Sequence, residues 1–114
     1  MQINLKDFCE AIRGHNLTPA IDMESIELEG AYVSDMLSDV MGSAKPNQAW
    51  ITIMKHLNTI AVASMTGVPV IIYSSGNVPE APVIEKALEE SVCLVSSGLP
   101  TFDIAGILYK LLGL

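Results

Sequence analysis

The sequence predicts a single α/β domain of three layers, with a mainly parallel β-sheet covered on both faces by short helices. From residue 26 onward, short apolar segments typical of strands alternate with segments of helical periodicity. The clearest strand, residues 68–73, has no polar face, which is typical of a strand buried on both sides. Strands that alternate with helices are joined by right-handed crossovers, so this order favours parallel pairing.

Length and charge limit the possible functions. The 114 residues are enough for one hydrophobic core, and no linker divides them, so we expect one domain over residues 1–114. Six basic and 13 acidic residues give a net charge of −7, which argues against nucleic acid or an anionic membrane as partner. The sequence has no signal-peptide pattern and no apolar run long enough to cross a bilayer, so we expect a cytoplasmic protein.

The first predicted elements are a helix and an edge strand. Asn4 is expected to cap a helix that runs to about Arg13 and is ended by Gly14. Residues 17–21 are expected to form a short strand, which Pro19 restricts to the edge of a sheet. The two cysteines form no CxxC pair and are expected to be buried core thiols: Cys9 and Cys93.

The next predicted elements are a strand and a short helix. Residues 26–33 are expected to form a strand, in which apolar Ile26 and Leu28 alternate with Glu27 and Glu29. Gly30 is expected to allow a close backbone approach. Ser34 and Asp35 follow and are expected to cap a short helix, whose apolar positions are Met36, Leu37 and Val40.

The remaining elements alternate regularly. Strands are predicted over residues 49–54, 68–73 and 92–95, and helices over residues 59–65 and 82–90. Pro82 suits a first helical turn. The last helix is expected to begin at Thr101 as its cap, and Asp103 favours its N-terminus through the helix dipole.

Polar residues follow each of these predicted strands. Because parallel strands place their carboxyl ends at one edge, we expect a rim that could hold a phosphate or carboxylate. The same residue types also make ordinary turns and caps, and that alternative stays open. The rim comprises Ser34 and Asp35, then Lys55, His56 and Asn58, then Ser74, Ser75 and Asn77, and finally Ser96, Ser97 and Thr101.

Evidence for catalysis in the sequence is weak. His56 could act as a base beside Asp35 or Asp103, or it could be an ordinary exposed histidine, as His15 is expected to be. Asp35 and Asp39 share a helix face and could hold Mg²⁺ with a substrate phosphate, or they could be solvated charges.

Several common catalytic motifs do not occur in the sequence. It contains no histidine pair with metal-ligand spacing, no P-loop, no GxGxxG and no GxSxG. We therefore predict no catalytic residue, no metal site, no cofactor and no phosphoryl transfer from ATP.

Three segments resemble the DRTGG-domain family. They are residues 29–41, with the pattern G-x-Y-V-x-D-x-L-S-D-V, residues 50–63, with H-L-N-x-x-A-V-A, and residues 99–106. The resemblance runs from about residue 30 to residue 112. It implies an α/β domain that is often dimeric, found beside CBS domains in pyrophosphatases and in phosphotransacetylases, and similar to the N-terminal half of the HPr kinase. Within the shared motifs it implies a site at Gly30, Asp35, His56 and Asn58.

The resemblance and the polar rim favour a regulatory or ligand-sensing module that forms a homodimer. An accessory protein docked on a larger enzyme complex is the alternative, and a small hydrolase or transferase using His56 and a carboxylate is a third hypothesis. Six methionines indicate adaptable apolar surface. We expect the dimer contact around residues 36–41 and the strand that follows, where the apolar side chains are Met36, Leu37, Val40 and Met41.

Overall fold

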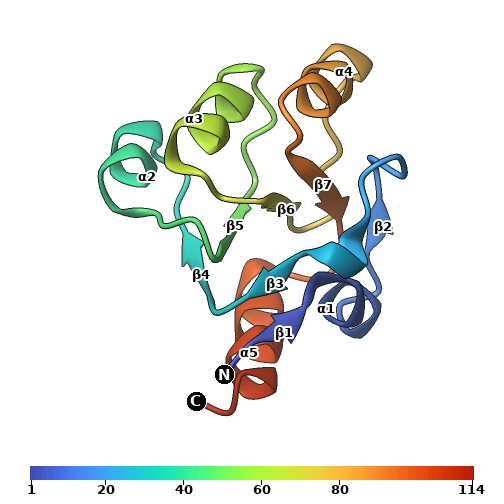
Figure 1. The fold of residues 1–114 in the computed structure, drawn as a ribbon, viewed down its shortest axis with the longest axis vertical. Coiled ribbons are helices and arrows are strands. Elements are labelled where there is room, and N and C mark those ends of the chain that lie inside the picture. The colour runs from blue at the N-terminus through green and yellow to red at the C-terminus, as the bar shows by residue number, and fades with distance from the viewer.

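A five-stranded sheet forms the centre of the computed structural model, which describes residues 1–114 (Figure 1). The strand order is β2-β7-β6-β5-β4, and only β2 runs antiparallel to its neighbour. This confirms the predicted mainly parallel sheet. The strands are β2 (His15–Asn16), β4 (Gly30–Val33), β5 (Gln48–Thr52), β6 (Val70–Tyr73) and β7 (Cys93–Ser96).

Strand β6 lies in the middle of the sheet, and all four of its residues are buried. Its alternate side chains enter two separate hydrophobic cores, as the period of two in a strand requires. Val70 and Ile72 pack into one core, whereas Ile71 and Tyr73 pack into the other. The prediction that residues 68–73 contain a strand buried on both faces is therefore confirmed.

Helices cover both faces of the sheet, as predicted (Figure 1). One core contains side chains of α1 (Leu5–Ala11) and α5 (Thr101–Leu111). The other core contains side chains of α2 (Leu37–Ser43), α3 (Asn58–Thr66) and α4 (Ala81–Glu89). No helix of the structure is both long enough and apolar enough to cross a membrane.

The predicted strand over residues 26–33 is divided in two, so this prediction was wrong in detail. Strand β3 (Glu27–Leu28) pairs with β1 (Ile3–Asn4) in a separate antiparallel ribbon, and β4 joins the main sheet. The division falls at Glu29, whose N–H donates to the carbonyl oxygen of Asn47 (2.8 Å). A 3-10 turn, η1 (Met23–Ser25), precedes β3.

The predicted edge strand over residues 17–21 was placed too late in the chain. The observed edge strand is β2, which pairs with the end of β7. Its ladder ends because the Thr18 hydroxyl takes the place of a backbone acceptor and binds the N–H of Leu94 (3.0 Å). A side chain that substitutes for backbone in this way leaves no periodic pattern in the sequence.

Asn4 caps α1 as predicted, since its side-chain oxygen accepts from the Lys6 N–H (3.0 Å). The predicted end of this helix at Gly14 was wrong, because the left-handed residue is Arg13 (φ 54°). Gly14 is needed for close packing instead: a Cβ there would lie 2.8 Å from both Cys9 Sγ and Val95 Cγ1.

The caps of the later helices differ from the prediction, whereas the first-turn residues agree with it. Neither α2 nor α5 has a side-chain cap. Ser34 Oγ accepts from the N–H of Met36 just before α2. Thr101 directs its hydroxyl to Ser74 rather than to the helix backbone. The positions of Pro82 and Asp103 in the first turns of α4 and α5 are confirmed.

Both cysteines are free and buried, as predicted. Burial raises the pKa of the Cys9 thiol and of the Cys93 thiol. A raised pKa disfavours the thiolate, which is the nucleophilic form. Both side chains therefore act as small apolar groups in the core that α1 and α5 share with the sheet.

Two glycine-to-alanine substitutions test the packing at Gly14. We expect Gly14→Ala to destabilise the fold by about 1–3 kcal/mol, because the new methyl group must displace core atoms. As a matched control, Gly106→Ala lies in α5 with no atom within 4 Å of the new Cβ, and we expect a gain of about 0.5–1 kcal/mol. Urea unfolding measures both values, and equal effects would contradict this account of Gly14.

Candidate functional site

The parallel strands end at one edge of the sheet and bring most of the predicted rim together. Ser34 and Asp35 follow β4, His56 and Asn58 follow β5, and Ser74 and Ser75 follow β6, whereas Ser96 ends β7 and Ser97 follows it. Gly30 lies at the opposite edge, because it begins β4 and pairs with Gln48 at the start of β5. The predicted close approach at Gly30 was wrong, since a Cβ there would meet only the Gln48 side chain at 3.9 Å.

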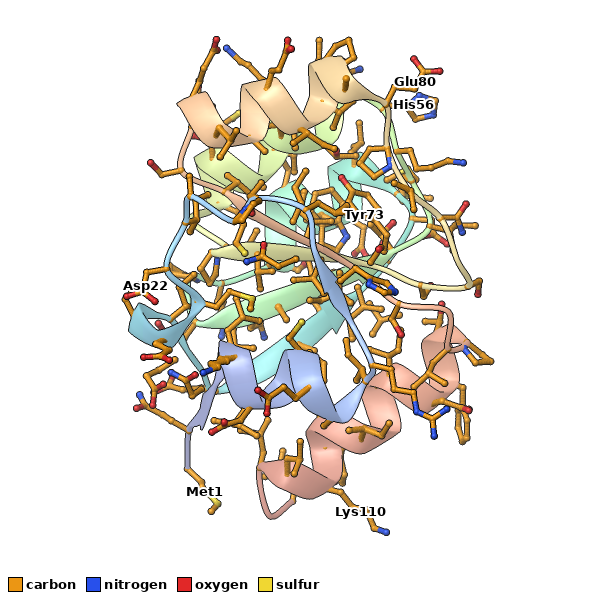
Figure 2. All side chains as sticks on the ribbon, turned by 90° about the vertical axis from the view of Figure 1, so that its right-hand side faces the viewer. Met1, Asp22, His56, Tyr73, Glu80 and Lys110 are labelled. Carbon is orange, nitrogen blue, oxygen red and sulfur yellow. The ribbon has the colours of Figure 1, made fainter.

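A groove of about 530 Å³ lies at this carboxyl edge, between two loops. One wall comes from the loop between β5 and α3, and the other comes from the loop between β6 and α4 together with the first turn of α4. Figure 2 shows His56 and Glu80 side by side, at the end of the molecule away from Met1 and Lys110. The lining residues are Lys55, His56, Leu57, Val78, Glu80, Pro82 and Val83.

Unpaired backbone donors surround this groove. Helices α3 and α4 both begin beside it, and neither has a side-chain cap. The N–H groups of residues 55–58 donate to no acceptor in the protein, nor do those of Glu80 and Ala81. Uncapped helix N-termini carry partial positive charge and present N–H groups to a ligand, so together they favour an anion.

The charged side chains of the groove are also free. Lys55, His56 and Glu80 are exposed and take part in no ion pair. A lysine beside free N–H groups suits a phosphate, whereas a carboxylate suits a hydroxyl or amino group of the same ligand. Half-exposed Leu57 and Val78 add an apolar surface. The groove can therefore hold a ligand with an anionic part and an apolar part.

The serine-rich loops are closed by their own hydrogen bonds. Ser74 is buried, and its hydroxyl bonds that of Thr101. Ser97 is buried, and its hydroxyl donates to the Ile12 carbonyl (2.7 Å) and accepts from the Leu99 N–H. Ser96 is buried opposite His15 in the sheet. None of these serines lines the groove.

Ser75 and Asn58 are exposed but also lie outside the groove lining. Ser75 has a left-handed backbone (φ 58°), and its N–H donates to the Leu99 carbonyl (2.8 Å). Asn58 is the first residue of α3, directly after Leu57 in the groove wall. Of the predicted ligand-binding residues, only His56 lines the groove.

Asp35 joins the ends of two neighbouring strands. Its Oδ1 accepts from the Thr52 hydroxyl (2.7 Å) and from the Ile53 N–H (3.1 Å). Asp39 accepts from the Tyr32 hydroxyl (2.8 Å). These two carboxylates therefore bind different protein donors, and the structure contains no group of three or more potential metal-ligating side chains.

The histidine partners predicted from the sequence are not observed. His56 makes no hydrogen bond to Asp35 or Asp103. The acidic residue that shares its groove is Glu80, which the sequence reasoning missed. Its position directly before α4, in the loop that follows β6, was the available signal.

A buried hydroxyl lies next to the His56 loop. The Thr59 hydroxyl donates to the His56 carbonyl (2.7 Å) and so fixes this loop to α3. The neighbouring Tyr73 hydroxyl is buried and has no hydrogen-bond partner. Burial raises the pKa of Tyr73 to about 12, and the nearby Thr59 hydroxyl opposes this shift, although its geometry falls short of a hydrogen bond.

These features define a small α/β domain with an open, donor-rich groove at the carboxyl ends of its strands. One solved structure with this fold contains the CBS and DRTGG domains of the regulatory region of Clostridium perfringens pyrophosphatase, complexed with the activator diadenosine tetraphosphate. The TM-score is 0.70 at 12% sequence identity, over 91% of this chain and 45% of that one. This chain therefore spans less than half the length of that structure.

The likeness confirms, at the level of the fold, the resemblance to DRTGG domains that the sequence motifs indicated. No protein-family model matches the chain. No curated protein sequence matches it either.

Two substitutions test the structural role of Asp35. We expect Asp35→Ala to destabilise the fold by about 1–2 kcal/mol, because two donors at the strand ends lose their acceptor. Asp35→Asn keeps an oxygen at Oδ1 and should lose less than half as much. Chemical denaturation gives both values, and an Asn variant as unstable as the Ala variant would show that charge, rather than the two hydrogen bonds, is what matters.

Because the Tyr73 hydroxyl is buried, we predict that the folded chain loses stability at high pH. The folded chain holds its phenolic proton more tightly than the unfolded chain, where the pKa is near 10. The resulting stability is complete below pH 10 and is lost as pH rises through about 12, a change of roughly 2–3 kcal/mol.

We expect Tyr73→Phe to remove this alkaline loss, while the exposed Tyr109→Phe control keeps it. At neutral pH, Tyr73→Phe should be neutral or stabilising by about 1 kcal/mol, because an unpaired buried hydroxyl is removed. Unfolding curves recorded from pH 8 to pH 12 test both statements. An unchanged alkaline slope in Tyr73→Phe would refute this assignment.

Proposed function

We propose that this chain is a regulatory or ligand-sensing module, without catalytic activity of its own, that binds a nucleotide or another phosphate-bearing ligand and forms a homodimer. The ligand site is the groove between the loop after β5 and the loop after β6. The DRTGG-like domain spans residues 1–114, and its motif-bearing part runs from about residue 30 to residue 112.

One observation carries the ligand class. Two uncapped helices begin at the same groove, and four consecutive N–H groups have no acceptor: those of Lys55, His56 and Leu57 in its wall and that of Asn58 next to it. The chain has a net charge of −7, so a site for an anion must supply its own local positive potential. Backbone donors, the helix dipoles and Lys55 supply it here.

The comparison supports a nucleotide in particular. The similar structure is a regulatory region complexed with a diadenosine polyphosphate, which contains both phosphates and apolar base surfaces. The groove of this chain offers the matching parts: Lys55 and free N–H groups for phosphate, and Leu57 and Val78 for an apolar surface. Glu80 can accept from a ribose hydroxyl or an exocyclic amine.

The composition of the groove supports binding rather than catalysis. No serine, threonine or cysteine lines it, so a hydroxyl or thiol nucleophile is missing there. His56 has no hydrogen bond to a carboxylate that would orient it as a base. We therefore expect no phosphate transfer from ATP to a protein serine.

Calorimetric titration with ATP and with inorganic tripolyphosphate tests this proposal, in magnesium-free buffer so that the free anions are the probes. We expect Lys55→Ala to weaken binding by about tenfold, because a charge-assisted contact of about 1.4 kcal/mol is lost. The control Lys110→Ala removes the same charge from the far end of the molecule and should leave affinity unchanged (Figure 2).

The two probes separate the parts of the ligand. Tighter binding of ATP than of tripolyphosphate would support use of the apolar wall. No binding of either anion, or equal losses in Lys55→Ala and Lys110→Ala, would contradict the proposed site.

A further inference from the structure

An apolar groove of about 320 Å³ lies between the edge strand β4 and helix α5, and it shares no lining residue with the ligand groove. We call it the β4–α5 groove. Seven of its nine lining residues are hydrophobic. The main ones are Ala31 and Val33 of β4, Leu108 and Tyr109 of α5, and Leu112 and Leu114 beyond it.

The charge of this groove differs from that of the molecule. The chain has a net charge of −7, yet none of the nine lining side chains is charged. In a two-fold contact each residue meets the same surface of the other copy, so a charged patch would meet its own sign. An apolar face without charged side chains is therefore the kind of surface on which two copies of this acidic chain can meet.

The strand beside the groove is an unprotected edge. β4 is the last strand of the sheet, and no further strand pairs with its outer side (Figure 1). In a parallel pair, alternate residues of an edge strand direct their N–H and C=O groups outward, where another strand can bind them. Proteins block such edges with lysine, proline or bulges, but β4 reads Gly30-Ala31-Tyr32-Val33 and contains none of these.

The other edge of the sheet offers much less. β2 has two residues, and the Thr18 side chain ends its ladder. Edge pairing through β4 is therefore the arrangement that combines open backbone groups with apolar side chains.

We propose that a second copy of this chain binds at the β4–α5 groove, with the two β4 strands antiparallel across a two-fold axis and the two sheets joined into one. Edge-to-edge contact by a two-fold axis places identical strands antiparallel. Val33 and Tyr109, which are 49% and 60% exposed, become buried in this contact. The inference rests on the homodimer in the proposed function and names its interface.

This interface differs from the one expected from the sequence. That expectation rested on four apolar side chains around α2, but Val40 is fully buried in the core and Leu37 packs against the same core. Met36 and Met41 remain exposed. These two methionines offer less apolar surface to a second copy than the seven hydrophobic residues of the β4–α5 groove do.

Sedimentation velocity at micromolar concentrations tests the proposal. The sedimenting species of the wild-type protein should have twice the mass of one chain. Val33→Lys places a charge at the β4 edge, and Tyr109→Glu places one in the groove; each should raise the dimer Kd by at least about tenfold. The matched control is Phe102→Glu on the same helix, which is 85% exposed but outside the groove and should leave the dimer intact.

Circular dichroism measures whether each variant is folded. Because there are two independent groove variants, the test still works if one of them does not fold. A wild-type monomer, or a dimer that both groove variants leave unchanged, would overturn the proposal; in the second case Met36→Glu combined with Met41→Glu tests the α2 surface. Tripolyphosphate titration of Val33→Lys should match wild type. That result separates failure of the dimer interface from failure of the ligand site.

Discussion

The burial of β6 on both faces is the constraint on which the rest of the structure depends. Its residues Val70, Ile71, Ile72 and Tyr73 are all buried, and the tyrosine hydroxyl is the only polar side-chain group among them, so both faces of the sheet must be covered. Burying one such side chain is worth roughly 1.5–3 kcal/mol. Separate layers of helices supply the two covers, and each layer completes its own hydrophobic core.

The same constraint determines where a site can form. Parallel strands joined by helices end at one edge, and each following helix begins there with N–H groups that its own backbone cannot satisfy. The loops at this edge treat their N–H groups in two different ways. The loops after β6 and β7 bond to each other, through Ser75 to Leu99 and Gly76 to Ser97. The segments directly before α3 and α4 make no such bonds, and the N–H groups of residues 55–58, Glu80 and Ala81 stay without acceptors beside the groove.

The sequence predicted the features that have a local signal. The fold class, the central strand, the proline in the first turn of α4 and the Asn4 cap all depend on neighbouring residues, and all were confirmed. Features that depend on distant contacts were missed. The partner of Ser97 is Ile12, 85 residues away in sequence, so nothing near Ser97 shows that its hydroxyl is already used.

Short strands were the other source of error. β1, β2 and β3 have two residues each, too few to show a period, and only their partners distinguish them from turns. Gly30 and Glu80 were misjudged for a related reason. Gly30 is the first residue of β4, and Glu80 directly precedes α4. Only correct strand boundaries show that Gly30 lies at the amino edge of the sheet and Glu80 near its carboxyl edge.

A titration with tripolyphosphate followed by amide chemical shifts of the ¹⁵N-labelled chain tests the central claim most directly, because the claim concerns backbone N–H groups. The account predicts that the largest shift changes fall on the amides of residues 55–58 and of residues 78, 80, 81 and 83, in or next to the two walls of the groove. Ser75, Ser97 and Leu99, whose loops are closed by their own hydrogen bonds, should move little. Shift changes centred on those serine loops, or none near His56, would contradict the account.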